Sequence, residues 1–442
     1  MPDHNSSRRR TTASHRPALP PASRTLPPLR WRRLCLVLML SLGACGGGGG
    51  GSSSATSSAA TAAATTSVGA QTDAELAAQL IAAANQATEV AATAPTNSTP
   101  TSTPVSTGGA SNSPLGAADL ALLVAEGDAT SEAIARAYQA ARGIPEANII
   151  RLPVSPGSDA ISAADFALVK QLLDARLPAN VQATLVTWTQ PSRVQGSCAM
   201  GLTSALAFGY DARWCGGCAR TLASPYYDSA SRRPWSDHRL RPSMMLGAST
   251  LADAQALIAR GVAADGQMQR SGASAVSGSG WLLRTSDSAR SVRYPDFMLL
   301  AASPVAGVAV HYLDSSSGTT AQTVTQQSDV MFYFTGLAQV PQLDSNRYLP
   351  GAVADHLTSF AGLLPAANGQ MPATRWLSAG LTGSYGTVEE PCNYTEKFSR
   401  ASVVVGHYQR GETLIEAYWK SVQWPGQGLF VGEPLARPWA TL

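Results

Sequence analysis

Residues 120–152 read LALLVAEGDATSEAIARAYQAARGIPEANIIRL, and this stretch decides the fold. It opens with the apolar run Leu120–Ala125, which predicts a short buried strand. Residues 131–142 then place apolar side chains at helical spacing, and Gly143 predicts the end of that helix. A second strand is predicted at Ile149–Leu152. Strand, helix and strand in this order predict a βαβ unit with a right-handed crossover.

The same alternation of strands and helices continues through the rest of the chain. Asp128 is expected to cap the first helix, since it directly precedes the helical pattern. Further strands are predicted at 183–188, 307–313, 330–334, 353–356 and 381–385, and further helices at 163–173, 251–264, 373–379 and 412–422. This order predicts an α/β fold with a mostly parallel sheet and helices on both faces, a three-layer sandwich. Ligands of such sheets bind at the carboxyl ends of the strands.

The first 45 residues have the layout of a bacterial export signal. A basic segment is followed by the apolar stretch 34–44, which is shorter than the roughly 20 residues of a transmembrane helix. The segment Leu42-Gly43-Ala44-Cys45 resembles a lipobox, which implies acylation of Cys45 and anchoring in a membrane. Two other readings stay open: a plain signal peptide with an incidental cysteine, and a twin-arginine signal at Arg32-Arg33.

Residues 46–113 consist mostly of Gly, Ser, Ala, Thr, Pro and Asn, and are expected to form a disordered tether. One marginal helix is expected within them, at 73–90. The predicted organisation is therefore a signal over 1–45, a tether over 46–113 and one globular domain over 114–442. The Gly46 that follows Cys45, in place of an aspartate, favours the outer membrane of a Gram-negative cell as the location.

Net charge and cysteine content limit which partners and which cellular compartment are expected. The net charge of +3 lies mainly in the arginine-rich signal, so we expect no nucleic-acid partner. Four cysteines remain beyond Cys45, namely Cys198, Cys215, Cys218 and Cys392. An even number in an oxidising compartment favours two disulfides, with three possible connectivities. The CxxC spacing of Cys215 and Cys218 leaves a zinc knuckle or a redox-active pair as alternatives.

The segment 355–359 (DHLTS) gathers an acid, an imidazole and hydroxyls at one strand end. It suggests a hydrolase in which Ser359 is the nucleophile and His356 the base. Strand alternation places Asp355 and Ser359 on one face and His356 on the other, so the chain would have to turn after Leu357. The alternative is structural: the hydroxyls and Asp355 cap the next helix, and His356 forms a core hydrogen bond.

The pair Glu389-Glu390 precedes Pro391 and Cys392. Two neighbouring carboxylates can serve acid–base chemistry or bind a hard cation, and Cys392 could be a thiolate nucleophile. The alternative is a turn pinned by Pro391 and a disulfide. The sequence has no glycine-rich phosphate loop, HExxH helix or GxSxG elbow, and we predict no cofactor and no metal.

Several longer segments resemble an uncharacterised exported bacterial family whose members often carry PEP-CTERM sorting tails. The resemblance covers residues 119–442 and implies no established activity. The matching segments include ARAY (135–138), RGIP (142–145), LTSALAFG (202–209), DHLTSF (355–360), GSYGTVEEPC (383–392), WPGQGL (424–429) and GEPLARP (432–438).

The closing GEPLARP also resembles the Gly-Asp-Pro segment of gingipain-like peptidases, which implies a caspase-like fold. Those peptidases carry a histidine and a nucleophilic cysteine at successive strand ends. The corresponding positions here, 334–336 and 358–360, hold neither residue, so the resemblance does not extend to cysteine-peptidase chemistry.

Three functions are consistent with these observations. The first is an envelope-anchored lipoprotein that binds an extracytoplasmic ligand or partner, such as a polysaccharide or peptide. The second is a hydrolase that uses Asp355, His356 and Ser359 with Glu389 or Glu390. The third is an inactive assembly or scaffold protein. Convergence of His356 with Ser359 or Glu389 would favour the hydrolase.

Overall fold

A computed structural model describes residues 112–270 and 276–441. The predicted signal, Cys45, nearly all of the predicted tether and its helix at 73–90 lie outside these residues. Within the described ranges, no helix combines the length and the apolar character needed to cross a membrane.

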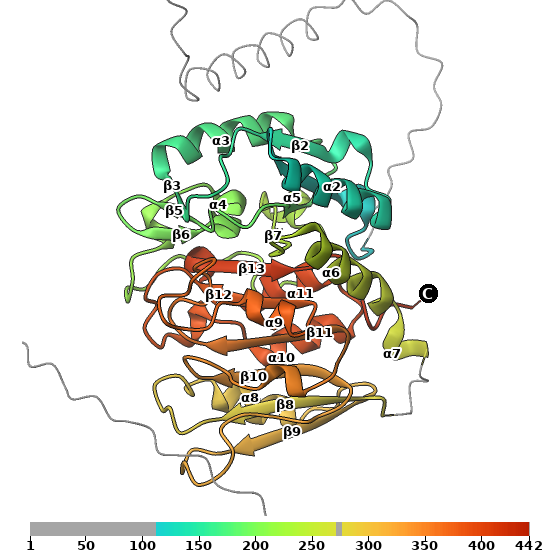
Figure 1. The fold of residues 1–442 in the computed structure, drawn as a ribbon, viewed down its shortest axis with the longest axis vertical. Helices are drawn as coiled ribbons and strands as arrows, with labels where there is room; N and C mark the ends of the chain where they lie inside the picture. The colour runs from blue at the N-terminus through green and yellow to red at the C-terminus, as the bar shows by residue number, and fades with distance from the viewer. Residues whose placement is uncertain (1–111, 271–275, 442) are drawn as a thin grey trace, which may run out of the picture. The chain divides into compact units, whose positions relative to one another are not determined.

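Ten strands form one sheet in the order β2-β1-β4-β7-β13-β12-β11-β10-β8-β9 (Figure 1). β12 and β13 run antiparallel, whereas the other pairings are parallel, and β13 meets β7 only through Val431 and Met245. The predicted mostly parallel sheet is thus confirmed. The strands are β1 (Leu120–Ala125), β2 (Ile149–Leu152), β4 (Ala183–Val186), β7 (Ser243–Met245), β8 (Gly278–Arg284), β9 (Val308–Asp314), β10 (Val330–Gly336), β11 (Tyr348–Leu357), β12 (Gly383–Thr387) and β13 (Gly428–Gly432). A separate small sheet contains β3 (Ala160–Ser162), β5 (Arg193–Gln195) and β6 (Ala199–Gly201).

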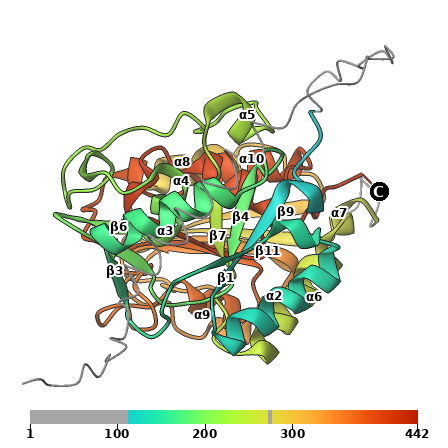
Figure 2. The ribbon, with the colours of Figure 1, turned by 90° about the horizontal axis from the view of Figure 1, so that it is seen from above.

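Helices cover both faces of the large sheet, as Figure 2 shows. One face carries α2 (Ala129–Arg142), α6 (Leu251–Ala264) and α9 (Thr374–Ser378). The other carries α3 (Ala163–Arg176), α4 (Leu202–Phe208), α8 (Tyr294–Ala301) and α10 (Ala401–Gln409), and α11 (Leu414–Ser421) packs on α10. The short helices α5 (Pro234–His238) and α7 (Gln267–Arg270) complete the set. This arrangement is the predicted three-layer sandwich.

The opening βαβ unit follows the rules read from its sequence. The Asp128 side chain accepts a hydrogen bond of 2.6 Å from the backbone N–H of Ser131, and so caps α2. Gly143 ends this helix in the left-handed conformation, with a φ of 67°, which glycine adopts without strain. β1 then lies between β2 and β4, buried along its whole length. These contacts place the unit at one end of the sheet.

Some elements differ from the sequence predictions. β11 is ten residues long, more than twice the predicted 353–356, because it continues in the amino-terminal direction beside β10. β7, β8, α8 and α10 were not predicted. β8 begins with two glycines in SGSG and shows little apolar alternation, and β7 has only three residues, so neither carries a strong strand pattern.

A buried ionic cluster joins α2 to the end of β13. The Glu433 carboxylate accepts hydrogen bonds from the Tyr138 hydroxyl (2.5 Å) and from Nε (2.9 Å) and Nη2 (2.8 Å) of Arg142. Arg142 also pairs with Asp265 at 2.6 Å. Gly261 of α6 lies against the same carboxylate, where a Cβ atom would collide with it. The glutamate of the GEPLARP segment thus bonds α2 to the end of β13, and Arg142 extends the cluster to Asp265 at the end of α6.

Candidate functional site

Asp355 lies near the carboxyl end of β11 and is engaged in a buried ion pair. Its Oδ1 atom is 2.6 Å from Nη1 of Arg293, and the Ser399 hydroxyl donates a hydrogen bond to Oδ2. Nη2 of Arg293 donates to the Thr335 carbonyl at 2.8 Å. Burial raises the pKa of the Asp355 carboxyl, while Arg293 and Ser399 act in the opposite direction. The carboxylate therefore ties β11 to the segments that precede α8 and α10.

His356 points to the other face of the sheet, as strand alternation predicts. It is 1% exposed. Its Nε2 atom is 3.1 Å from the Met371 carbonyl, and the Trp376 indole N–H donates to its Nδ1 atom at 3.0 Å. Burial lowers the pKa of His356 to about 3, so the ring is neutral at physiological pH. Both ring nitrogens are used in the core, and neither is bonded to a hydroxyl.

Thr358 contributes its hydroxyl, and Ser359 its backbone carbonyl, to structural hydrogen bonds after β11. The Thr358 hydroxyl donates to Oε1 of Gln370 at 2.7 Å, and the carbonyl of Ser359 accepts a bond of 2.9 Å from the Thr387 hydroxyl. Asp355 and His356 lie on opposite faces, each with its own partners. The described contacts do not bring the predicted catalytic residues Asp355, His356 and Ser359 together. The core hydrogen bonds of His356 match the structural alternative, but its predicted helix cap is wrong, because Asp355 pairs with Arg293 and the next helix begins only at Thr374.

The side chains of Glu389 and Glu390 diverge after β12. Oε2 of Glu389 accepts hydrogen bonds from the backbone N–H groups of Gly216 (3.2 Å) and Gly217 (3.0 Å). Oε1 of Glu390 accepts from the N–H of Cys392 at 2.8 Å. Each carboxylate stabilises a turn, and the two do not share a hydrogen-bond partner. This geometry matches the alternative in which Pro391 and a disulfide pin the turn.

The four cysteines form two disulfides, Cys198–Cys215 and Cys218–Cys392. The prediction of two disulfides is confirmed and its connectivity is fixed. Cys215 and Cys218 do not bond to each other, so the redox-active CxxC alternative is wrong. All four sulfur atoms are consumed, which removes the thiolate ligands of a zinc knuckle and the proposed Cys392 nucleophile.

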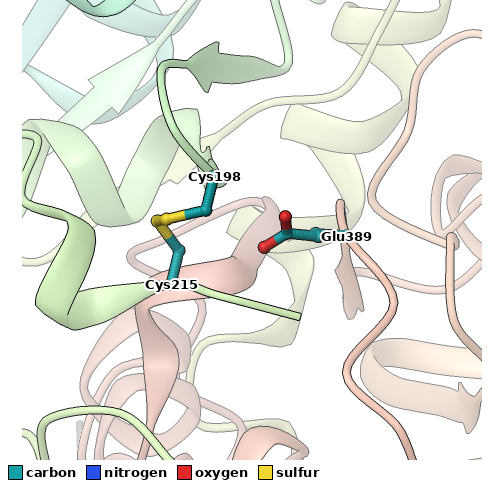
Figure 3. A group of neighbouring side chains, drawn as sticks. All are labelled: Cys198, Cys215 and Glu389. Atoms are coloured by element: carbon teal, nitrogen blue, oxygen red, sulfur yellow. A yellow bond between two sulfur atoms is a disulfide. The ribbon is translucent and has the colours of Figure 1, made fainter. Parts of the chain in front are cut away.

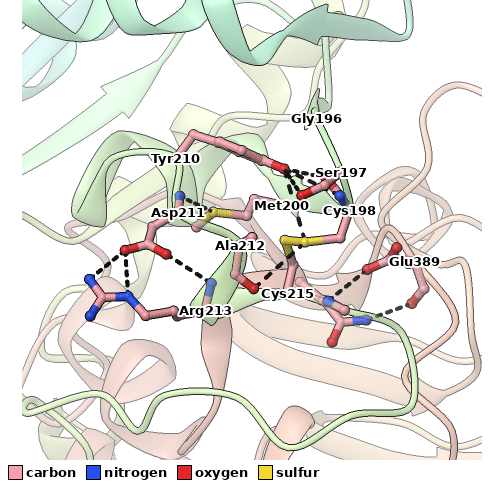
Figure 4. The surroundings of a disulfide bond; sticks show 12 residues. Gly196, Ser197, Cys198, Met200, Tyr210, Asp211, Ala212, Arg213, Cys215 and Glu389 are labelled. Atoms are coloured by element: carbon pink, nitrogen blue, oxygen red, sulfur yellow. Dashed lines mark hydrogen bonds and ion pairs between the residues drawn. A yellow bond between two sulfur atoms is a disulfide. The ribbon is translucent and has the colours of Figure 1, made fainter.

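Figure 3 shows the Cys198–Cys215 bond with the Glu389 carboxylate beside it. In the surroundings of this bond (Figure 4), the Tyr210 hydroxyl donates to the carbonyl of Cys198 at 3.0 Å and accepts from its N–H at 3.2 Å. Nζ of Lys397, which is fully buried, donates to the Gly217 carbonyl. Burial lowers the pKa of Lys397 to about 8, and the nearby glutamates oppose this effect. The loop at 215–218 is thus held against the turn after β12.

These contacts close part of the edge where ligands of parallel sheets usually bind. The chain after β4 crosses to this edge, where the N–H of Leu364, in the loop that follows β11, donates to the Ser192 hydroxyl oxygen at 3.2 Å. A hollow of about 640 Å³ lies elsewhere, near the amino ends of β4 and β7. Its lining includes Trp235 and Arg241, which the sequence did not single out. The only signal was their closeness in the chain, next to Pro234 and Pro242.

Comparisons with known proteins identified no relative of this chain. No family model, no curated protein and no solved structure matches the chain. The resemblances suggested by the sequence segments therefore stay predictions, and the function has to be argued from the geometry.

Proposed function

We propose that the chain is an extracytoplasmic lipoprotein, anchored through Cys45 in the outer membrane of a Gram-negative cell, whose globular domain binds a ligand or partner. Two disulfides that join distant segments suit an oxidising compartment outside the cytoplasm. A tether over 46–113 would let the domain reach on the order of 45 Å from the membrane.

The two hydrogen bonds of His356 favour a binding function over hydrolysis. A general base must have a free nitrogen within reach of the hydroxyl that it deprotonates. His356 uses both nitrogens in a dry core, between Met371 and Trp376. A hydrolase centred on Ser359 would have to break these bonds and bring the ring to the opposite face of the sheet.

Activity-based labelling tests the absence of a nucleophile. The purified full chain is treated with a fluorophosphonate probe and a thiol-directed probe, beside Ser359→Ala and His356→Asn variants. We expect no labelling of the folded, oxidised protein by either probe. Fluorophosphonate labelling that disappears in both variants would overturn the proposal and establish a serine hydrolase.

Metabolic labelling with palmitate tests the anchor. We expect the label to be lost in Cys45→Ser and retained in Cys35→Ser, the matched cysteine within the predicted signal. Equal labelling of both variants would rule out Cys45 as the acylated residue. Fractionation of the labelled cells then reports which membrane holds the protein.

A further inference from the structure

The hollow of about 640 Å³ between α3, α4 and α5 has an uneven charge. Arg241, Arg239 and Lys170 line it, and Asp174 is the only acid among the lining residues. Lys170 and Asp174 form an ion pair with each other along α3. The two arginines therefore give the hollow its net positive charge. Its volume falls in the range of roughly 300–1,000 Å³ that small-molecule sites occupy.

Arg241 is the unusual member of this set. Its side chain is almost fully buried, with 8% exposure, and its guanidinium lies 3.4 Å from the centre of the Trp235 ring. Its Nε atom donates to the Val181 carbonyl at 3.0 Å. Among the contacts of the described residues, no carboxylate pairs with Arg241, and its two Nη groups have no hydrogen-bond acceptor. Asp174 favours the charged form of Arg241 without bonding to it. Burial of a guanidinium without a bonded carboxylate is unfavourable.

The position of Arg241 is fixed from two sides. Trp235 belongs to α5, whose backbone N–H groups at Trp235 and Ser236 donate to Oε1 of Gln182 at 3.1 and 3.3 Å. Gln182 and Val181 belong to the segment before β4, and Arg241 precedes β7. Burial lowers the pKa of Arg241 to about 10. The group still carries its charge at neutral pH, where it would be stabilised by a bound anion.

Apart from Thr184, the rest of the lining is apolar. Leu173, Leu177, Leu206 and Phe208 lie on the α3 and α4 sides. Phe208 is itself stacked on Trp214, with ring centres 3.9 Å apart. A ligand that fits this hollow would place an anionic group at Arg241 and an apolar or ring-shaped body against these side chains.

We propose that this hollow is a binding site for a small organic carboxylate with an apolar or aromatic body, in which the two Nη groups of Arg241 hold the carboxylate against Trp235. A guanidinium matches a carboxylate through two parallel hydrogen bonds. Asp174 at the same hollow disfavours a dianion, so a carboxylate is favoured over a phosphate monoester. This assignment rests on the proposed binding function and adds the site and the ligand class.

Benzoate is the first probe, with benzamide as its neutral counterpart of the same shape. Binding to the purified full chain is followed by ligand-observed saturation-transfer NMR and by calorimetry. We expect benzoate to bind at least tenfold more tightly than benzamide, and phenyl phosphate to bind more weakly than benzoate. Equal affinity for benzoate and benzamide would overturn the site, and this comparison needs no variant.

Arg241→Met retains the apolar stem and removes the guanidinium. We expect it to lose at least tenfold in benzoate affinity, whereas Arg213→Met, at an exposed arginine outside the hollow, should bind as the wild type does. Arg241→Lys, which retains the charge without the paired donors, should fall between the two. Undiminished binding by a folded Arg241→Met would overturn the assignment.

The two proposals fail in different ways. A chain that binds benzoate through Arg241 and is also labelled by fluorophosphonate would keep this site and overturn the non-catalytic function. A chain that is not labelled and shows no preference for benzoate would keep the general function and overturn this site.

Discussion

The indole N–H of Trp376 donates a 3.0 Å hydrogen bond to Nδ1 of His356, on the face of the sheet opposite to Asp355. This contact fixes the imidazole as a neutral acceptor at Nδ1 and a donor at Nε2 toward the Met371 carbonyl. The histidine that the sequence suggested as a catalytic base is thus a core residue. Its replacement should therefore change the stability of the fold.

The stability of the domain should depend on pH through His356. A histidine in the unfolded chain has a pKa of about 6.5, whereas His356 in the folded protein has a pKa of about 3. Between these two pH values the unfolded chain binds a proton that the folded protein does not bind. The contribution of His356 to the free energy of unfolding is therefore fully present above a pH of about 6.5 and is lost as the pH falls. Between pH 6 and 4, we expect the free energy of unfolding to fall by about 1.4 kcal/mol per pH unit more steeply than in His356→Gln. Urea unfolding across this range measures it, and His311→Gln, at an exposed ring, should keep the wild-type slope.

Breaking the Arg293–Asp355 pair should destabilise the fold strongly. Asp355→Ala leaves a buried guanidinium without its carboxylate, and we expect a loss of about 3–5 kcal/mol. The double variant Arg293→Met with Asp355→Leu removes both charges and should recover much of this loss. Denaturant unfolding of the wild type, Arg293→Met, Asp355→Leu and the double variant forms a double-mutant cycle, with Asp355→Ala measured beside it. If Asp355→Ala were as mild as Ser359→Ala, the pair would have no structural role.

The two disulfides should contribute unequally. They join residues 17 and 174 positions apart, and loop-closure entropy grows with this separation. On that basis we expect a loss of about 3 kcal/mol for Cys198→Ser with Cys215→Ser and about 5 kcal/mol for Cys218→Ser with Cys392→Ser. Unfolding of the oxidised variants by urea measures both. The reverse order would show that native contacts outweigh chain entropy at this edge.

Gly261→Ala tests the Glu433 cluster. The added methyl group would meet a carboxylate that Tyr138 and Arg142 hold in place, so we expect a clear drop in melting temperature. Gly406→Ala is the matched control in α10, where the nearest atom to the added Cβ is Nη1 of Arg410 at 3.5 Å. That variant should be neutral or gain up to about 1 kcal/mol from the better helix propensity of alanine. Equal effects would mean that the cluster can move aside.

Local patterns predicted much of this fold. The βαβ unit, the cap at Asp128 and the bounds of α6 follow from apolar spacing and from the chemistry of helix ends. The antiparallel pairing of β12 with β13 did not follow, because the partner of a strand is set by contacts between distant segments. β8 was missed because its glycines leave little pattern to recognise.

The candidate site was predicted less well. Strand alternation correctly separated Asp355 from His356, but nothing in the sequence pointed to Arg293, 62 residues earlier, as the partner of Asp355. Arg241 and Trp235 were missed for a related reason, because a stacked pair six residues apart has no characteristic spacing in a loop.

The Cys218–Cys392 bond has a consequence for the order in which the chain matures. In a protein that crosses a membrane from its amino end, Cys198, Cys215 and Cys218 all reach the oxidant long before Cys392 does, since 174 residues separate the last two. Before Cys392 emerges, only one native bond, Cys198–Cys215, can form among these three thiols. Cys215 and Cys218 are the nearest neighbours in the nascent chain, so they can pair with each other instead. In the proposed extracytoplasmic location, an early Cys215–Cys218 bond would have to be exchanged before Cys392 can pair with Cys218, and we expect a strain without a disulfide isomerase to accumulate the mispaired chain.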